Sequence, residues 1–366
     1  MKKLKVLHIM NGAATGGISK VVLGICQSLV DENFSFDIAI DDPNIGFNGY
    51  KLKELGCKII IIPRRREISS YCKAIKQLVR DNSYDIIHIH LNESSTFPLI
   101  LTKMLGHNKV IVHAHTARKP KGLRDHINFF ALRLFSVLLA DKLIACSSEA
   151  GKSMYGDRLC SKASFTICKN YIDADKYLFN SKIREQIRGE LGCNKDTLLI
   201  GCIGTLREEK NNIFSVKVFE HVLDYNVNAK LVFVGDGNRR NELVEYISNR
   251  GLNDKVILVG NKENVTEYLS SFDCFLMPSL YEGFPVAALE AIASGLPVVL
   301  SDTITKDLCV FTNIYYLSLM ESPKEWAKTI NLILNNQNER SKGVSTVKEK
   351  GFDYSSLKKD YLEIYS

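Results

Sequence analysis

Short apolar runs that alternate with amphipathic stretches dominate the pattern of hydrophobic and polar residues in the first half of the chain. These runs are rich in Val and Ile, and they are KVLHIM (5–10), FDIAI (36–40), KIIIIP (58–63), DIIHIH (85–90), KVIVHAH (109–115) and KLIAC (142–146). Continuous apolar runs of this length are typical of strands that are buried on both faces. Residues 19–30 and 70–82 carry apolar side chains at helical spacing and predict helices between the strands. This alternation predicts a parallel sheet covered by helices on both faces.

The same pattern starts again near Leu198. Its apolar runs are LLIGCIG (198–204), KLVFVGDG (230–237), VILVG (256–260), CFLMP (274–278), PVVLSD (297–302) and IYYLSL (314–319). A polar, charged connector at about 170–192 separates the two series, and an amphipathic stretch at 354–365 predicts a last helix. We therefore expect an α/β protein with two doubly wound, Rossmann-like domains facing across a cleft, where ligands bind beyond the carboxyl ends of the strands.

The expected domains cover residues 1–180 and 190–350, and residues 351–366 form a C-terminal helix that packs back on the first domain. A chain of 366 residues fits two domains of ordinary size. Ten cysteines occur without a C-x-x-C pair, which predicts reduced and mostly buried thiols of a cytoplasmic protein. The N-terminal MKKLKVLHIM leads into Asn-Gly without a cleavage site, and no apolar run has the ~18–20 residues of a membrane span.

The net charge of +7 is divided unevenly along the chain. Residues 1–189 carry 29 Lys and Arg against 17 Asp and Glu, and residues 190–366 carry 19 against 24. A basic half beside an acidic half predicts an anionic partner for the first domain. The basic residues Arg118, Lys119, Lys121 and Arg124 precede an apolar stretch at 129–140. This order favours peripheral contact with an anionic membrane, whereas no nucleic-acid motif is present.

Several segments that follow strands could bind phosphate. Gly16 and Gly17 open a helix after the first strand, where free backbone N–H groups can approach an anion. Their spacing from Gly12 does not fit G-x-G-x-x-G, which argues against an NAD site. In GTLREEKN (204–211), Arg207 and Lys210 offer cations to a diphosphate, or they lie in a solvated turn. The Gly-Asp-Gly turn at 235–237, with two arginines after it, is open to the same two interpretations.

Two H-x-H pairs place histidines on one face of a strand, at 88 and 90 and at 113 and 115. Further ligands for a metal ion are not evident near either pair, so no metal site is expected. We interpret His88 and His113 as packed and hydrogen-bonded. His90 and His115 lie nearer the strand ends, where a role in the cleft is more credible. Asp-Ala-Asp at 173–175 matches D-x-D but lies in the connector, so we interpret it as unrelated to metal–diphosphate binding.

The segment SLYEGFPVAALEAIASGLPVVLSD (279–302) carries the most specific signal. Glu282 lies just before a helix that Pro285 is expected to begin and Gly295 to end. Glu290 lies within this helix among apolar residues, and a buried carboxylate is costly unless it is hydrogen-bonded. Two sugar hydroxyls would satisfy such a carboxylate, and the helix start suits a phosphate or a sugar hydroxyl.

This segment strongly resembles the paired-glutamate signature of glycosyltransferase family 4, a family of retaining enzymes with the GT-B fold. Similarity extends over nearly the whole chain, with supporting pieces NGAATGGISKVVL, DIIHIHLN, VIVHAHT, LIACSSEAGKSMYG, KNYIDADKY, GTLREEKN and LVFVGDGNRRNEL. The pieces HAHT, ACSSEAG and ASGLPVVLSDTITKDL are similar to members that build bacterial capsular polysaccharides and exopolysaccharides.

The resemblance implies a role for each matching residue. It implies that Glu290 holds the ribose of the donor nucleotide, and that His115 and Glu282 contact the donor sugar. Lys210 is expected to pair with the diphosphate, with Thr205 where the family commonly has arginine and with Arg207 as its possible substitute. The remaining residues implied in donor binding are Gly16 and Gly17 near the diphosphate, Gly260, Asn261 and Val265 near the base, and Gly283, Phe284, Pro285 and Val286 at the helix start.

The resemblance implies a retaining transferase that moves a sugar from a nucleotide-sugar, by expectation a UDP-sugar, to a lipid-linked saccharide. No metal or other cofactor is expected, and the site of action is expected to be the cytoplasmic face of the cell membrane. Two alternatives remain open. One is a non-hydrolysing sugar-nucleotide epimerase, and the other is a non-catalytic sugar-nucleotide-binding subunit of a polysaccharide assembly.

Overall fold

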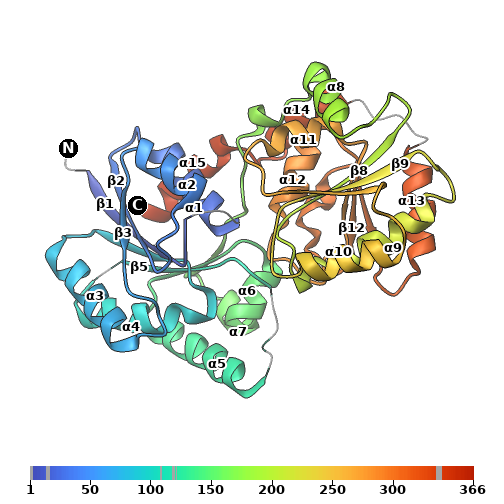
Figure 1. Cartoon of the computed structure of the whole chain (residues 1–366). Helices are drawn as coiled ribbons and strands as arrows, with labels where there is room; N and C mark the ends of the chain where they lie inside the picture. Colours follow the sequence, from blue (N-terminus) through green and yellow to red (C-terminus); the bar gives the residue numbers. More distant parts are fainter. Residues whose placement is uncertain (1–2, 14–16, 108, 118–119, 121, 335–339) are drawn as a thin grey trace. The chain divides into compact units, whose positions relative to one another are not determined.

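The computed structural model describes all residues except 1–2, 14–16, 108, 118–119, 121 and 335–339. The chain divides into two compact units. Unit 1 holds residues 1–171 and 354–366, and unit 2 holds residues 172–353. Figure 1 shows that each unit is a sheet with helices against its faces. Both sheets are parallel and doubly wound, so the predicted fold class is confirmed.

Unit 1 is built on a seven-stranded sheet with the order β3-β2-β1-β4-β5-β6-β7. Its strands are β1 (Leu4–Met10), β2 (Phe34–Ile40), β3 (Lys58–Ile61), β4 (Ile86–Ile89), β5 (Val110–Ala114), β6 (Lys142–Ala145) and β7 (Phe165–Ile167). Its helices are α1 (Gly17–Leu29), α2 (Gly46–Glu54), α3 (Ile68–Asp81), η1 (Asn92–Ser95), α4 (Thr96–Met104), α5 (Gly122–Leu139), α6 (Ser148–Tyr155), α7 (Asp157–Cys160) and the C-terminal α15 (Tyr354–Tyr365).

The C-terminal helix α15 packs in unit 1 against α1 and the sheet. Leu357, Tyr361, Ile364 and Tyr365 are buried with apolar residues of β1, β2 and α1 in one core cluster. A Cβ atom on Gly24 would lie 2.9 Å from the hydroxyl oxygen of Tyr354. The side chains of α15 therefore complete the core of unit 1, although α15 is far in sequence from the other elements of that unit.

Unit 2 is built on a six-stranded sheet with the order β10-β9-β8-β11-β12-β13. Its strands are β8 (Leu198–Ile203), β9 (Ala229–Val234), β10 (Val256–Gly260), β11 (Cys274–Met277), β12 (Val298–Ser301) and β13 (Ile314–Leu317). Its helices are η2 (Ala174–Tyr177), α8 (Ser181–Glu190), η3 (Glu208–Lys210), α9 (Asn212–Val222), α10 (Arg240–Asn249), α11 (Val265–Ser271), α12 (Val286–Ala293), η4 (Lys306–Val310), α13 (Pro323–Leu334), η5 (Arg340–Lys342) and α14 (Gly343–Glu349).

One predicted detail of the helix α12 (Val286–Ala293) differs from the structure. Pro285 is the residue before α12 rather than its first helical residue, because its ψ of 78° lies outside the helical region. The helix ends at Ala293, and Gly295 follows with the left-handed φ of 70° that favours glycine after a helix. All ten cysteines are free thiols and six of them are buried, as predicted, whereas Cys309 is exposed.

Candidate functional site

The two loops that carry the strongest sequence signals lie side by side in unit 2. They follow β8 and β11, which are neighbours in the sheet, so both loops leave the same edge. The amide of Leu280 donates a hydrogen bond to the carbonyl of Glu209 (2.8 Å), and the side chain of Asn211 donates to the carbonyl of Pro278 (3.2 Å). Asn211 has a left-handed φ of 54°, which turns the chain into α9. These contacts hold the two loops together.

Lys210 and Glu282 form an ion pair across these loops. Lys210 Nζ lies 2.5 Å from Glu282 Oε1, and Ser279 Oγ donates to the same carboxylate oxygen at 3.0 Å. The two side chains are only 22% and 15% exposed, so solvent screens the pair weakly. The two residues that were expected to contact different parts of the donor therefore contact each other in this structure. Because the two residues are 72 positions apart, the pattern of hydrophobic and polar residues could not predict this ion pair.

Glu290 is buried inside α12 at 1% exposure, as its apolar neighbours predicted. The hydroxyl of Tyr177 donates to Glu290 Oε1 at 2.8 Å, and Ser294, the residue after α12, donates to the carbonyl of Tyr177 at 3.1 Å. The hydroxyl of Tyr177 thus satisfies one oxygen of the carboxylate, for which the sequence predicted sugar hydroxyls as hydrogen-bond partners. Tyr177 is the last residue of the KNYIDADKY segment, which contributed to the family resemblance. The sequence did not predict its contact with Glu290.

Backbone at the start of α12 is held by internal packing. Gly283, Phe284 and Pro285 are buried, and the ring of Phe284 stacks on Phe352 with centroids 6.0 Å apart. The amide of Val286 donates to the carbonyl of Phe284 at 3.0 Å. The side chain of Phe284 therefore belongs to the core of unit 2, and its part in any donor contact would come from the backbone.

Glycines let the neighbouring loops of unit 2 approach closely. Gly235 has a φ of 137°, and a Cβ atom there would lie 2.1 Å from the carbonyl oxygen of Gly204. The amide of Gly235 donates to the carbonyl of Gly260 at 2.8 Å, which ties the ends of β9 and β10 together. Beside them, Asn261 is exposed and Val265 is half-buried at the start of α11.

Among the basic side chains near these two loops, some lie at the surface, whereas Lys210 is largely buried. Arg207 is exposed, and with Thr205 it lines a surface depression. After the Gly-Asp-Gly turn, Arg239 pairs with Glu242 and Arg240 lies 3.9 Å from Asp236, as in an ordinary solvated helix start. Lys210 is therefore the cation that lies deepest in the pair of loops.

The Asp-Ala-Asp motif is engaged in surface ion pairs. Asp173 pairs with Lys176 at 2.8 Å, and Asp175 pairs with Lys348 at 2.7 Å. The first pair is local to η2 and the second joins η2 to α14, which is a structural use of the motif.

The remaining predicted residues lie in unit 1. Gly16 lies outside the described residues. Gly17 begins α1 and is exposed, and a Cβ atom on it would meet nothing within 4 Å. Packing therefore does not require glycine at position 17, which leaves room for a ligand close to the backbone.

His115 directly follows β5 and is half-buried. Its amide donates to the side-chain oxygen of Asn92 at 2.8 Å, and its Nε2 lies 2.8 Å from His90 Nδ1. Asn92 has a left-handed φ of 50°. Burial lowers the pKa of His115 to about 3, so the imidazole is neutral. Both ends of the residue are thus fixed by neighbours.

The packed histidines differ from one another. His88 is hydrogen-bonded through Nδ1 to the hydroxyl of Tyr365 at 2.8 Å, as predicted. For His113 the prediction of a hydrogen bond is wrong, because neither ring nitrogen has a hydrogen-bond partner among the described residues. The expectation of no further ligand beside the H-x-H pairs is also wrong, because His8 of β1 lies next to His88 and His90. The topology reveals this, since β1 and β4 are neighbours in the sheet.

Two family models match successive parts of the chain. The model described as Glycosyltransferase Family 4 matches residues 15–176, and the model described as Glycosyl transferases group 1 matches residues 183–350. The second match contains every predicted site residue of unit 2, from Arg207 to Glu290.

Similar proteins carry glycosyltransferase names. The chain is 26% identical over 332 residues to the protein of Bacillus subtilis that bears the name glycosyltransferase EpsF, covering 89% of this chain and 86% of that one. It is 23% identical over 329 residues to UDP-Gal:alpha-D-GlcNAc-diphosphoundecaprenol alpha-1,3-galactosyltransferase of Escherichia coli, covering 85% and 82%. The solved structure of Anabaena Alr3699/HepE in complex with UDP-glucose is similar in fold, with a TM-score of 0.83, 17% identity and coverage of 98% of both chains.

Proposed function

The chain belongs to the glycosyltransferases that join a family 4 domain to a group 1 domain, and we propose that it transfers a sugar from a UDP-sugar to a lipid-linked saccharide during synthesis of a capsular polysaccharide or exopolysaccharide. The observation that carries the proposal is the ion pair of Lys210 with Glu282 at the neighbouring ends of β8 and β11, with Glu290 buried in the helix that follows. The relative from Escherichia coli supports the substrate class, because its name gives UDP-Gal as donor and a diphosphoundecaprenol-linked sugar as acceptor.

Each part of the unit 2 site matches one part of a UDP-sugar. Lys210 offers a cation to the diphosphate, and the weakly screened surroundings strengthen that attraction. Glu290, fixed by Tyr177, offers carboxylate oxygens to the ribose hydroxyls. Glu282 offers its carboxylate to a hydroxyl of the donor sugar once Lys210 turns to the diphosphate. The amide groups at the start of α12 add partial positive charge near the phosphates.

We propose transfer with retention of the anomeric configuration. In a front-face substitution the acceptor oxygen bonds to the anomeric carbon on the side from which the diphosphate leaves. The electrons of the broken carbon–oxygen bond go to UDP, and the proton of the acceptor hydroxyl goes to a phosphate oxygen. Lys210 stabilises the negative charge that develops on the leaving group, an electrostatic role that needs no metal ion. Addition of Mg²⁺ or Mn²⁺ should therefore not stimulate turnover.

A panel of UDP-sugars tests the donor and separates the alternatives. We expect one UDP-sugar to raise the thermal unfolding temperature most and to release UDP only when a lipid-linked saccharide is added. Conversion of the UDP-sugar into an epimer without acceptor would show an epimerase instead. Stabilisation by UDP without turnover on any acceptor would show a non-catalytic binding subunit. No stabilisation by any nucleotide-sugar would overturn the proposed donor site.

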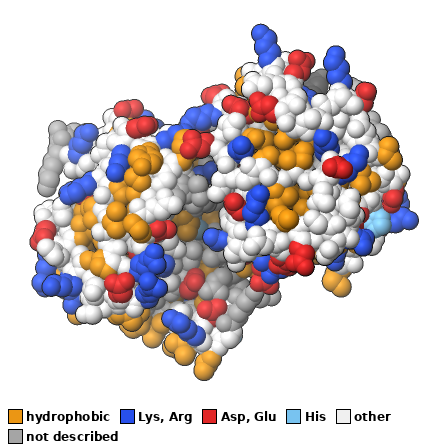
Figure 2. Space-filling view, viewed as in Figure 1, with side chains coloured by type: hydrophobic (Ala, Val, Ile, Leu, Met, Phe, Trp, Pro, Cys, Tyr) orange, Lys and Arg blue, Asp and Glu red, His pale blue; other side chains and the backbone are white. Residues whose placement is uncertain are grey.

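We also propose that helix α5 contacts the membrane that holds the acceptor. Its side chains Leu123, Ile127, Phe130, Leu134 and Leu138 recur at helical spacing and are 44–78% exposed. Phe97 and Met104 of α4, which packs against α5, are also exposed, at 55% and 74%. Figure 2 shows hydrophobic side chains gathered at the lower edge of unit 1, where Figure 1 places α5. An exposed apolar stripe along a helix is typical of contact with the interface of a bilayer.

Charge and length favour an interfacial position for α5. Arg124 and Arg133 lie exposed on the same helix, whereas Arg118, Lys119 and Lys121 lie outside the described residues. Among the described residues, no helix combines the length and the apolar character needed to cross a bilayer. Basic residues beside an apolar stripe suit a surface of anionic lipids, so we expect the protein to act peripherally at the inner face of the cell membrane.

Co-sedimentation with vesicles tests this contact. Wild type should bind phosphatidylglycerol vesicles better than phosphatidylcholine vesicles. A Phe130→Gln/Leu134→Gln double variant should lower the partition coefficient by about tenfold or more, because two largely exposed apolar side chains no longer enter the interface. Val227→Gln in unit 2, at a residue that is 78% exposed, is the matched control and should bind as wild type does. Equal binding by all three proteins would contradict the membrane role of α5.

A further inference from the structure

Five histidines of unit 1 gather on one face of its sheet. His8 on β1 lies level with His88 on β4, and His90 at the end of β4 lies beside His113 and His115 of the next strand and its exit. The sequence intervals are even within each strand, so all five side chains point to the same side. His8, His88, His90 and His113 have no exposed surface. This cluster lies under α1 and α15, in the core of the unit.

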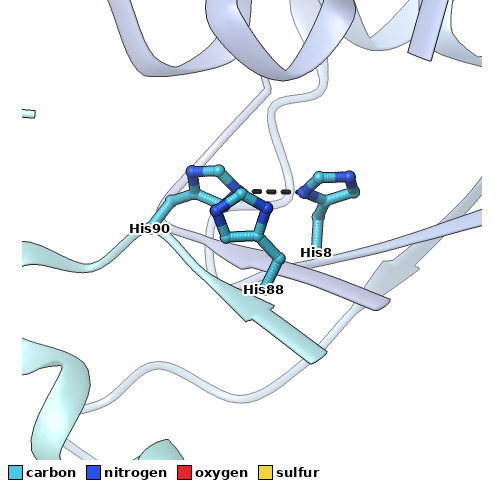
Figure 3. Close-up of side chains that lie close together, drawn as sticks. All are labelled: His8, His88 and His90. Atoms are coloured by element: carbon cyan, nitrogen blue, oxygen red, sulfur yellow. Dashed lines mark hydrogen bonds between the residues drawn. The ribbon is translucent and has the colours of Figure 1, made fainter. Parts of the chain in front are cut away.

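Three of these rings converge closely (Figure 3). His8 Nδ1 lies 2.9 Å from His90 Nε2, and the rings of His88 and His90 have centroids only 4.0 Å apart. One ring nitrogen from each of the three residues lies within 4.8 Å of the other two. Figure 3 shows that the triad spans two neighbouring strands, with His8 from one and both other histidines from the next.

The outer nitrogens of the triad are held by other residues. His88 Nδ1 lies 2.8 Å from the hydroxyl of Tyr365, and His90 Nδ1 lies 2.8 Å from His115 Nε2. If His88 donates from Nδ1 to Tyr365, the lone pair of its Nε2 remains for another partner. Histidines that bind metal ions usually have their second nitrogen hydrogen-bonded in this way, which fixes the tautomer and the orientation of the ring.

The protein leaves some nitrogens of this buried cluster without partners. His8 Nε2 and His88 Nε2 have no hydrogen-bond partner among the described residues, although both rings are fully buried. A neutral imidazole offers one N–H donor and one lone pair, so a ring that donates from one nitrogen presents the lone pair of the other. A buried polar atom without a partner is unfavourable, and an ion on the lone pair of His88 Nε2 would relieve that cost.

We propose that His8, His88 and His90 bind one transition metal ion through a ring nitrogen of each. Neutral imidazole is a ligand that zinc, copper and nickel ions accept, whereas magnesium and calcium ions prefer oxygen. Zinc–nitrogen bonds of about 2.0–2.1 Å with tetrahedral angles separate ligand nitrogens by about 3.3 Å. His8 and His90 would then move apart by roughly 0.4 Å, and the proton between their nitrogens would move to the other nitrogen of the ring that carries it, so that both imidazoles stay neutral.

Such an ion would stabilise unit 1 and its C-terminal helix. The triad joins β1 to β4, and His88 links it to Tyr365 near the end of α15. An ion that binds the folded chain and not the unfolded one raises the unfolding temperature. This site is separate from the nucleotide site of unit 2 and does not depend on the proposed transfer reaction.

The test uses the full chain without a histidine tag. After treatment with a chelator, the protein is incubated with Zn²⁺, or with Cu⁺ under anaerobic reducing conditions, and excess metal is removed by gel filtration. Elemental analysis should find about one ion per chain for at least one of the two metals. At a metal concentration about 100 times the Kd, the unfolding temperature should rise by roughly 5–10 °C.

Two variants assign the ligands. His8→Phe and His88→Phe keep an aromatic ring in the core and should each lower retained metal at least tenfold. His221→Phe changes a partly exposed histidine in unit 2 and should retain metal as wild type does. Circular dichroism of the metal-free variants reports whether they fold. Retention of neither metal by wild type would overturn the proposal, whatever the variants do, and so would equal retention by wild type and folded His88→Phe.

Discussion

The ion pair between Lys210 and Glu282 leads to opposite expectations for its two members. In this structure the carboxylate of Glu282 pairs with the ammonium group of Lys210, which we propose to bind the diphosphate. Binding of UDP therefore competes with this pair. Removal of the cation should weaken UDP binding, whereas neutralisation of the carboxylate should leave the cation free and should not weaken it.

The sizes follow from the burial of the pair. A hydrogen bond from a charged group contributes about 1.5–3 kcal/mol, so Lys210→Met should raise the Kd for UDP by roughly 10- to 150-fold. With side chains 22% and 15% exposed, the pair lies between a surface ion pair, worth up to about 1 kcal/mol, and a buried one. Glu282→Gln should therefore bind UDP as well as wild type or up to about fivefold tighter. Its kcat/KM should nevertheless fall by roughly 10- to 150-fold, because the contact with the donor sugar loses its charge.

Isothermal titration calorimetry with UDP and an acceptor-dependent assay of UDP release measure these quantities. Lys217→Ala and Glu245→Gln remove the same charges from exposed positions of unit 2 and should behave as wild type does. Thermal unfolding monitored by circular dichroism shows whether each variant is folded. Equal weakening of UDP binding by Lys210→Met and Glu282→Gln would refute the reasoning, and so would an unchanged Kd in Lys210→Met.

Three further substitutions test other contacts of the account. Tyr177→Phe removes the hydrogen bond to buried Glu290 and should lower the free energy of unfolding by about 1.5–3 kcal/mol, measured by urea denaturation, and an unchanged midpoint would show that the bond is unimportant. Gly235→Ala places a Cβ atom 2.1 Å from a carbonyl oxygen at a left-handed φ, so it should give little folded protein. Gly17→Ala meets nothing within 4 Å, so its unfolding temperature should match wild type while its KM for the UDP-sugar rises, and an unchanged KM would remove Gly17 from the donor site.

All strands of the two sheets except β7 could be predicted, because each of them is a short apolar run between polar segments. Elements with weak patterns could not. Strand β7 has only three residues, of which none is fully buried, and α2 contains two glycines and a mostly polar sequence. The position of Pro285 was wrong by one residue, since its ψ angle is set by the loop before α12 and not by a local propensity.

The residues of the candidate site could be predicted from motifs, but their contacts with one another could not. Glu290 contacts a tyrosine 113 residues away, and Lys210 contacts a glutamate 72 residues away. Such pairs depend on which strands are neighbours in the sheet. The same holds for His8, whose place beside His88 follows from the pairing of β1 with β4. The position of His8 beside His88 could have been predicted from the strand order of a doubly wound sheet, in which β1 and β4 are neighbours.

The anomeric configuration of the product tests the central claim most directly. Proton nuclear magnetic resonance can follow the anomeric signal while the protein, its UDP-sugar and a lipid-linked saccharide react. The account predicts that the donor signal decays and that a new glycosidic signal of the same configuration appears only when acceptor is present. A product of the opposite configuration, or a new sugar-nucleotide signal without acceptor, would contradict it.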